Sequence, residues 1–190
     1  ASSLTTVSIN DDIQKIVGNA FENCSQLTLN TYDNAYYLGN TTNPYVVSFN
    51  KKANNISSVQ INSNCKLIYY RAFYNCTDLT SISIPSNVKY IGSDAFWNCS
   101  SLSSAEFASV EDLCKIDFEN ALSNPIKKAE GFKINNTLVT TLTIPNTITE
   151  LKDYTFTNCK ALTSITIPAT VEQVGLETFK DSVTNNIVSN

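Results

Sequence analysis

A 23-residue period runs through most of this chain of 190 residues and constrains its fold more than any other feature. In the segment Leu79–Cys99, eight apolar anchors occupy fixed positions, and five copies along the chain repeat all eight without an internal gap. Units start at residues 4, 27, 56, 79, 102, 139 and 162, and a truncated unit starts at 185. The sequence therefore predicts a single repeat array over residues 1–190.

Each unit predicts one short strand followed by a turn that brings the chain back. Around Ile82 and Ile84, apolar and polar residues alternate with a period of two, which is typical of a strand. Pro85, Pro145 and Pro168 follow the predicted strands of three units, where no backbone donor is needed. Because so short a unit buries too little apolar surface to fold alone, we expect neighbouring units to stack as a solenoid of about seven coils.

The pattern L-x-x-I-x-I-P-x-x-V-x-x-I-G-x-x-A-F-x-x-C of Leu79–Cys99 resembles the BspA-like (bacterial surface antigen type) leucine-rich repeat, and the resemblance covers residues 4–182. It implies an α/β repeat fold, mostly β: a leucine-rich-repeat solenoid with a parallel sheet on its concave face. The irregular units, of 29 residues from Leu27 and 37 residues from Leu102, are similar to longer variant units of that family.

Composition excludes several classes of function. With 13 basic and 17 acidic residues the net charge is −4, which argues against a nucleic acid partner. The chain has no histidine, which removes His-based triads and His-ligated metals. No uninterrupted apolar run exceeds four residues, so we expect no membrane insertion in this segment.

The residues suited to catalysis are few. The acidic segment Glu106–Glu119 is the one candidate for an acid/base pair, and it lacks the spacing of a calcium loop. Glu111 and Asp112 are better explained as the first turn of a helix, where carboxylates are stabilised by the helix dipole. With 5 glycines the chain has no glycine-rich phosphate loop. We predict that this is not an enzyme and that it needs no cofactor or metal.

Four of the six cysteines, Cys24, Cys76, Cys99 and Cys159, occupy one repeat position and are expected to line a column inside the coils. No close pair such as C-x-x-C indicates a metal site. Neighbouring coils lie about 4.8 Å apart, within reach of a disulfide between Cys76 and Cys99. Because parallel side-chain vectors make that bond awkward, we predict free thiols that pack as small apolar groups.

Outward-facing residues of the predicted strands form two polar lanes. On the concave face these lanes either solvate a parallel sheet or form a hydroxyl-lined trough for an extended peptide or a glycan. The first lane comprises Thr6, Ser58, Ser81, Ser104, Thr141 and Ser164, and the second comprises Ser8, Gln60, Ser83, Glu106, Thr143 and Thr166.

An aromatic patch is a second candidate for binding, because exposed Tyr, Trp and Arg are enriched in interface hot spots. The alternative is that these rings cover the back edge of the coils and the seam at the irregular unit. The patch comprises Tyr69, Tyr70, Arg71 and Tyr74 of one unit with Tyr90 and Trp97 of the next, and the irregular unit adds Tyr32, Tyr36, Tyr37 and Tyr45.

Six N-x-[ST] sequons are glycosylation acceptors if the source is eukaryotic. Three of them precede a column cysteine, where we expect a turn and amide side chains bonded to the backbone. The sequons lie at Asn23, Asn40, Asn55, Asn75, Asn98 and Asn135.

These features together predict a non-catalytic protein-interaction module. The resemblance implies a cell-surface or secreted protein that adheres to a host, matrix or cell-surface protein. The alternative is a carbohydrate-binding or spacer segment of a larger surface protein. The chain contains no methionine and both ends lack a polar cap, so we expect an excised stretch whose signal and anchor lie outside it, or weak self-association through open ends.

Overall fold

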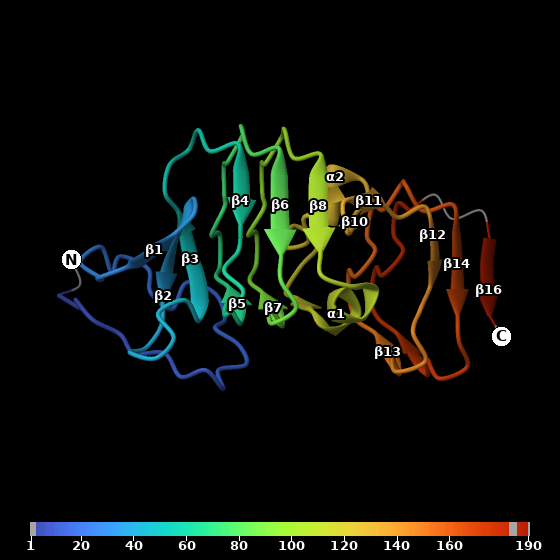
Figure 1. Cartoon of the computed structure of the whole chain (residues 1–190), viewed down its shortest axis with the longest axis horizontal. Helices are drawn as coiled ribbons and strands as arrows, with labels where there is room; N and C mark the ends of the chain where they lie inside the picture. The colour runs from blue at the N-terminus through green and yellow to red at the C-terminus, as the bar shows by residue number, and fades with distance from the viewer. Residues whose placement is uncertain (1–2, 183–185, 190) are drawn as a thin grey trace.

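The computed structural model describes residues 3–182 and 186–189 and is an elongated stack of short coils. Figure 1 shows the coils following one another along the long axis from the N-terminus to the C-terminus. Parallel strands join successive coils on two sides of the stack. The predicted leucine-rich-repeat solenoid, mostly β, is therefore confirmed.

One side of the stack, here called the strand face, carries the strands that the alternation of apolar and polar residues predicts. Along β6 (Ser81–Ile84), Ile82 and Ile84 are buried while Ser81 and Ser83 point outward, half-buried. Neighbouring strands pair in parallel with a shift of one unit, so that Ser81 lies between Ser58 and Ser104. The strand face comprises β4 (Ser58–Gln60), β6, β8 (Ser104–Phe107), β12 (Thr141–Thr143), β14 (Ser164–Ile167) and β16 (Asn186–Ser189).

The opposite side, here called the back sheet, consists of two-residue strands and one longer strand. Ile68 and Ile91 point into the core at paired positions. Gly92 follows the strand where coils approach closely, and a Cβ atom there would lie 2.6 Å from the backbone nitrogen of Tyr70. The strands are β3 (Val47–Lys51), β5 (Leu67–Ile68), β7 (Tyr90–Ile91) and β9 (Asp117–Phe118), and further along β13 (Glu150–Leu151) and β15 (Gln173–Val174).

The core is a continuous column of apolar side chains from the irregular unit that starts at Leu27 to the last coils. Phe73 and Phe96 occupy one repeat position and stack with ring centroids 5.5 Å apart. Phe156 and Phe179 repeat this stacking at 5.7 Å. Each coil therefore buries its apolar face against the next one, which is why a single unit has no core of its own.

The recurrent asparagine before the column cysteine has a backbone cause. Asn75, Asn98 and Asn158 have φ values of 58°, 58° and 54°, in the left-handed region that asparagine tolerates better than other non-glycine residues. The expected amide bonds to the backbone are wrong for the adjacent pair, because Asn98 Nδ2 donates instead to Asn75 Oδ1 at 3.0 Å. Asn158 Nδ2 does donate to a backbone group, the carbonyl oxygen of Lys127 at 2.7 Å, so the feature that these residues share is the left-handed turn conformation.

All six cysteines carry free thiols, which confirms the prediction. Cys76, Cys99 and Cys159 are buried in the predicted column, while Cys24 is half-buried. Cys99 Sγ donates to the carbonyl oxygen of Phe73 at 3.2 Å, and burial raises the pKa of the Cys99 thiol to about 12. The buried column thiols of Cys76, Cys99 and Cys159 are therefore neutral and shielded in the folded protein.

We therefore expect alkylation to depend on unfolding. Iodoacetamide at pH 8 should modify Cys24 first in the native protein, and all six thiols only in denaturant without a reductant, because the thiolate is the reactive form. Intact mass before and after treatment gives the count. A denatured, unreduced protein that gains no mass would show that the cysteines are paired.

The long unit from Leu102 interrupts both sheets. Its additional residues form helix α1 (Val110–Lys115), helix α2 (Ile126–Ala129) and a hairpin of β10 (Lys133–Ile134) and β11 (Thr137–Leu138). β10 pairs with the free edge of β8, so β8 and β12 do not pair with each other. The parallel sheet predicted for this face is therefore present, and the insertion divides it into two sheets.

Helix α1 confirms the predicted role of the acidic residues at its start. The side chain of Ser109 caps the helix by accepting a hydrogen bond from the backbone nitrogen of Asp112 at 3.0 Å. Glu111 and Asp112 lie in the first turn, and Glu111 pairs with Lys115 at 2.6 Å. These two carboxylates therefore stabilise helix α1.

The unit from Leu27 also contains an insertion, a hairpin of β1 (Asn30–Tyr32) and β2 (Ala35–Leu38). Strand β2 pairs antiparallel with β3 and occupies the edge where the preceding coil would continue the back sheet. Residues 3–29 accordingly contain no strand. They pack on the outer side of the back sheet, where the backbone nitrogen of Phe21 donates to the Tyr69 hydroxyl at 2.9 Å.

Within the described residues, no helix combines the length and the apolar character that crossing a membrane requires.

Candidate functional site

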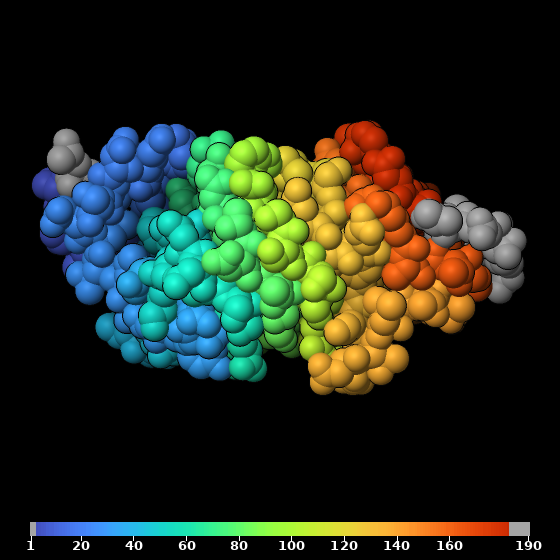
Figure 2. Space-filling view, turned by 90° about the horizontal axis from the view of Figure 1, so that it is seen from above, coloured from blue at the N-terminus to red at the C-terminus, as the bar shows by residue number. Residues whose placement is uncertain are grey.

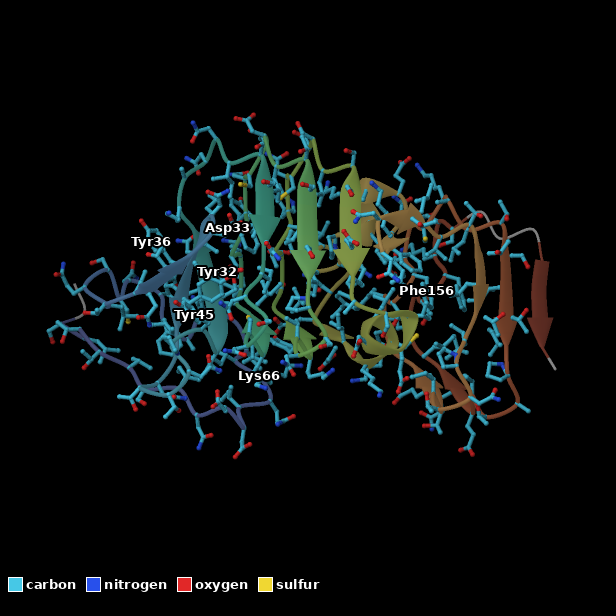
Figure 3. The ribbon with its side chains drawn as sticks, viewed as in Figure 1. Tyr32, Asp33, Tyr36, Tyr45, Lys66 and Phe156 are labelled. Atoms are coloured by element: carbon cyan, nitrogen blue, oxygen red, sulfur yellow. The ribbon has the colours of Figure 1, made fainter. Side chains whose placement is uncertain are left out.

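A polar trough lies on the strand face, over the three strands β4, β6 and β8. Its floor is a grid of side chains that point away from the core, with the buried Val59 and Ile82 beneath them. Figure 3 shows oxygen atoms along the exposed side of these three strands. The cavity has a volume of about 420 Å³ and is lined by Asp33, Ser58, Gln60, Ser81, Ser83, Ser104, Glu106 and Asn136 together with the two apolar residues.

The turn of the β1–β2 hairpin forms the wall beside β4. The backbone nitrogen of Gln60 donates to Asp33 Oδ2 at 2.8 Å, and Asn34 Nδ2 donates to the carbonyl oxygen of Ser58 at 2.9 Å. Figure 3 shows Asp33 next to β4. The two side chains thus satisfy the edge of β4 in place of a neighbouring strand, which protects the edge and fixes the Asp33 carboxylate.

Three tyrosines support this wall. Tyr37 is fully buried and meets Tyr32 and Tyr45 edge to face, with ring centroids 6.5 and 5.6 Å apart. The hydroxyl of Tyr37 accepts a hydrogen bond from the backbone nitrogen of Asn62 at 3.2 Å, and burial raises the pKa of Tyr37. This cluster confirms the alternative interpretation of these rings, which cover the seam at the irregular unit.

The β10–β11 hairpin forms the opposite wall. Its turn residues, Asn135 and Asn136, have φ values of 50° and 62°, as a tight two-residue hairpin requires. The backbone nitrogen of Asn136 donates to Glu106 Oε1 at 2.8 Å and so holds the second carboxylate of the trough. Figure 2 shows the gold segment that contains this hairpin projecting beyond the green coils along the lower edge of the view.

The trough unites half of the residues in the two predicted lanes: Ser58, Gln60, Ser81, Ser83, Ser104 and Glu106. The remaining lane residues lie outside its walls. Thr6 and Ser8 line a separate shallow pocket with Gly39–Thr41, because the β1–β2 hairpin intervenes. The four lane residues beyond the second hairpin are Thr141, Thr143, Ser164 and Thr166, on β12 and β14.

The wall residues Asp33 and Asn136 were missed by the repeat pattern, because they lie in the insertions that break it. A signal was nevertheless present in the sequence. Asp33-Asn34 and Asn135-Asn136 are each flanked by short apolar or aromatic segments, which is typical of two-residue hairpin turns.

The aromatic patch is smaller than predicted. Tyr69 and Tyr90 are 6% and 1% exposed, because the displaced N-terminal segment covers them, so their assignment to an exposed surface is wrong. Phe49 stacks on Tyr69 at 5.0 Å, and the ammonium group of Lys15 lies 4.8 Å from the ring centre of Tyr90. Both rings therefore serve the packing of that segment on the back sheet.

Four residues of the patch remain together near the surface. The guanidinium of Arg71 lies 4.8 Å from the ring centres of both Tyr70 and Tyr74, and it pairs with Asp94 at 3.5 Å. Tyr74 stacks on Trp97 with centroids 4.7 Å apart, and Trp97 is 38% exposed. Tyr70, Arg71, Tyr74 and Trp97 are called the aromatic ladder below.

The sequons differ in accessibility. Asn40 uses its whole amide within the fold: its Nδ2 donates to the carbonyl oxygen of Ile9 at 2.8 Å, and its Oδ1 accepts from Thr42 and Asn43. The other five sequon asparagines are exposed. Among residues 3–182, where the structure places side chains, no group of three or more candidate ligands is arranged to hold a metal ion.

The repeat geometry agrees with the comparison to known families. The model of the BspA type leucine rich repeat region matches six copies over residues 1–124 and 127–190. The chain belongs to this family. The gap in the match, residues 125 and 126, falls in the long unit that interrupts both sheets.

Several solved structures of leucine-rich repeat proteins are similar to the chain. That of Treponema pallidum is 17% identical with a TM-score of 0.45 and covers 68% of this chain and 73% of its own. A leucine rich cell surface protein of Faecalibacterium prausnitzii is 22% identical with a TM-score of 0.40, and the match covers 85% of this chain and 45% of that protein. A leucine-rich repeat protein of Bacteroides ovatus is 21% identical with a TM-score of 0.46, and the match covers 94% of this chain and 46% of that protein. This chain thus spans slightly less than half the length of the last two. No curated protein matches it.

Proposed function

We propose that this chain is a non-catalytic protein-interaction module of a cell-surface or secreted protein, and that it contributes to adhesion by binding a host, matrix or cell-surface protein. Membership of the BspA-type family supports an interaction role, and one relative of similar fold is described as a cell surface protein. The polar trough is the observation that carries the proposal, because it offers a walled site with no reactive constellation.

The shape of the trough suits an extended segment of a partner protein. Its floor presents hydroxyl and amide groups from three strands at a regular spacing of about 4.8 Å. Backbone donors and acceptors of an extended peptide recur about every 3.3 Å, so a peptide lying across the three strands has a polar group within reach of each of them. The aromatic ladder is a second contact surface in this proposal, since Trp, Tyr and Arg supply binding energy when a partner covers them.

A substitution that fills the trough should abolish capture of the partner. We expect Ser81→Trp, at the centre of the floor, to reduce binding to matrix proteins at least ten-fold in a pull-down from extracellular-matrix extract, read out by mass spectrometry. Ser101→Trp adds the same side chain at an exposed turn outside the trough and should bind like the wild type.

Two further arms separate the alternatives. Trp97→Ala should weaken capture less than Ser81→Trp if the trough is the principal surface. A glycan array probed with the same proteins tests the carbohydrate-binding alternative. Binding to sugars alone, or equal capture by Ser81→Trp and the wild type, would contradict the proposal.

A further inference from the structure

The polar trough carries a charge pattern that the repeat itself does not dictate. Among the residues that line it, Asp33 and Glu106 are the two ionisable groups, and none is basic. They occupy opposite walls, one at the free edge of β4 and the other on β8 beside the β10–β11 turn. The strands β4 and β8, which form the two ends of the floor, lie two strand spacings or about 10 Å apart.

Each carboxylate is held by one oxygen and leaves the other for a ligand. Asp33 Oδ2 accepts from the backbone nitrogen of Gln60, and Glu106 Oε1 accepts from that of Asn136. Neither carboxylate forms an ion pair, although six such pairs occur in the described part of the chain. Two fixed carboxylates that pair with no basic side chain thus face a cavity of about 420 Å³.

We propose that the trough recognises an extended peptide segment with two basic side chains, Lys or Arg, two residues apart. This inference rests on the proposed function and names the chemistry of its partner. Side chains at positions i and i+2 of an extended chain lie on one face about 7 Å apart, and flexible lysine side chains cover the remaining distance to both walls. Charge-assisted hydrogen bonds to fixed carboxylates favour a cation over a neutral residue.

The lining also argues for a peptide rather than a glycan. No aromatic side chain lines the trough, so a sugar ring finds no flat surface to stack on. The serine hydroxyls along the floor instead match the donors and acceptors of a peptide backbone. The basic side chains then fix the position of the peptide between the two walls.

The test uses the full chain and three fluorescent, end-capped pentapeptides of the sequence Ser-Xaa-Ser-Xaa-Ser. Both Xaa residues are lysine in the first peptide, glutamine in the second and glutamate in the third. We expect the lysine peptide to bind at least ten-fold more tightly than the other two in fluorescence anisotropy, and the difference to shrink as salt is added. Asp33→Asn and Glu106→Gln should each weaken its binding about five-fold. Both keep an oxygen acceptor for the backbone nitrogen that holds the side chain.

Glu172→Gln is the matched control, because it removes one exposed carboxylate far from the trough and should leave affinity unchanged. Equal binding of the three peptides, or unchanged affinity in the Asp33→Asn, Glu106→Gln double variant, would overturn the inference. Loss of partner capture in Ser81→Trp alone would then still support the proposed function. Conversely, charge-selective peptide binding with unaltered capture by Ser81→Trp would support the cation site and reject the proposed function.

Discussion

Replacing Phe96 by alanine is expected to lower the free energy of unfolding by about 3–5 kcal/mol, because the side chain is fully buried in the middle of the core column. Its ring stacks on Phe73 of the preceding coil, at 6° between the ring planes. Removing it leaves a cavity between two coils that the rigid strand pairing on both sides does not allow to close. Equilibrium unfolding in urea, followed by circular dichroism, measures the effect.

Phe179→Ala is the matched control for position in the stack. Phe179 occupies the same repeat position, stacks on Phe156 with the same 6° between ring planes, and is half-buried in the last coils of the described structure. Phe179→Ala should therefore lower the free energy of unfolding clearly less than Phe96→Ala does. A loss below about 1 kcal/mol for Phe96→Ala would show that the core is not continuous through the central coils. Equal losses in the two variants would show that position in the stack does not set the size of the effect.

Replacing Asn124 by alanine should lower the free energy of unfolding by about 2–4 kcal/mol, because the Asn124 amide bridges the break between the two halves of the solenoid. Asn124 is fully buried, and its Nδ2 donates to the carbonyl oxygens of Tyr154 and Thr155 at 2.9 and 3.0 Å. Its Oδ1 accepts from the backbone nitrogen of Ile126 at 2.9 Å. Among the strands of residues 3–182 and 186–189, none pairs across this break, so alanine leaves buried backbone groups without partners.

The control for Asn124 is Asn87→Ala, which removes an exposed amide with one bond, to the carbonyl oxygen of Ser63 at 2.8 Å. Water replaces that bond, so we expect a loss below about 1 kcal/mol. Urea unfolding of both variants provides the comparison. Similar midpoints for Asn124→Ala and the wild type would show that its amide bonds are not needed to join the two halves, which Asn158 Nδ2 and the backbone nitrogen of Ala161 also bridge by donating to the carbonyl oxygens of Lys127 and Glu130.

The repeat period was sufficient to predict the fold, because each anchor position imposes burial on every coil. Ile82, Ile84 and Phe96 lie in the core as their spacing requires, and the cysteine column follows from the same register. The period also predicts the floor of the trough, since residues between the strand anchors must face outward. This rule alone places Ser81 and Ser83 on the floor of the trough, where the structure has them.

The insertions could not be predicted from the period, because they follow no repeat. The β1–β2 hairpin takes the edge of β3, which displaces residues 3–29 onto the back sheet and buries Tyr69 and Tyr90. The repeat pattern of Leu4–Cys24 gave no sign of this, since its own anchors are intact and a long-range competitor for the same edge decides the outcome. The wall residues of the trough were missed for the same reason.

The distance between the two hairpin walls follows from the number of regular coils that separate the irregular units. Duplicating residues 56–78 in register would insert one more strand between β4 and β6 and move the walls apart by about 4.8 Å. Relatives with more or fewer regular coils between two such hairpins would then accept longer or shorter segments with no change in any contact residue. Copy number thus becomes a molecular ruler, adjustable by unequal recombination rather than by point mutation.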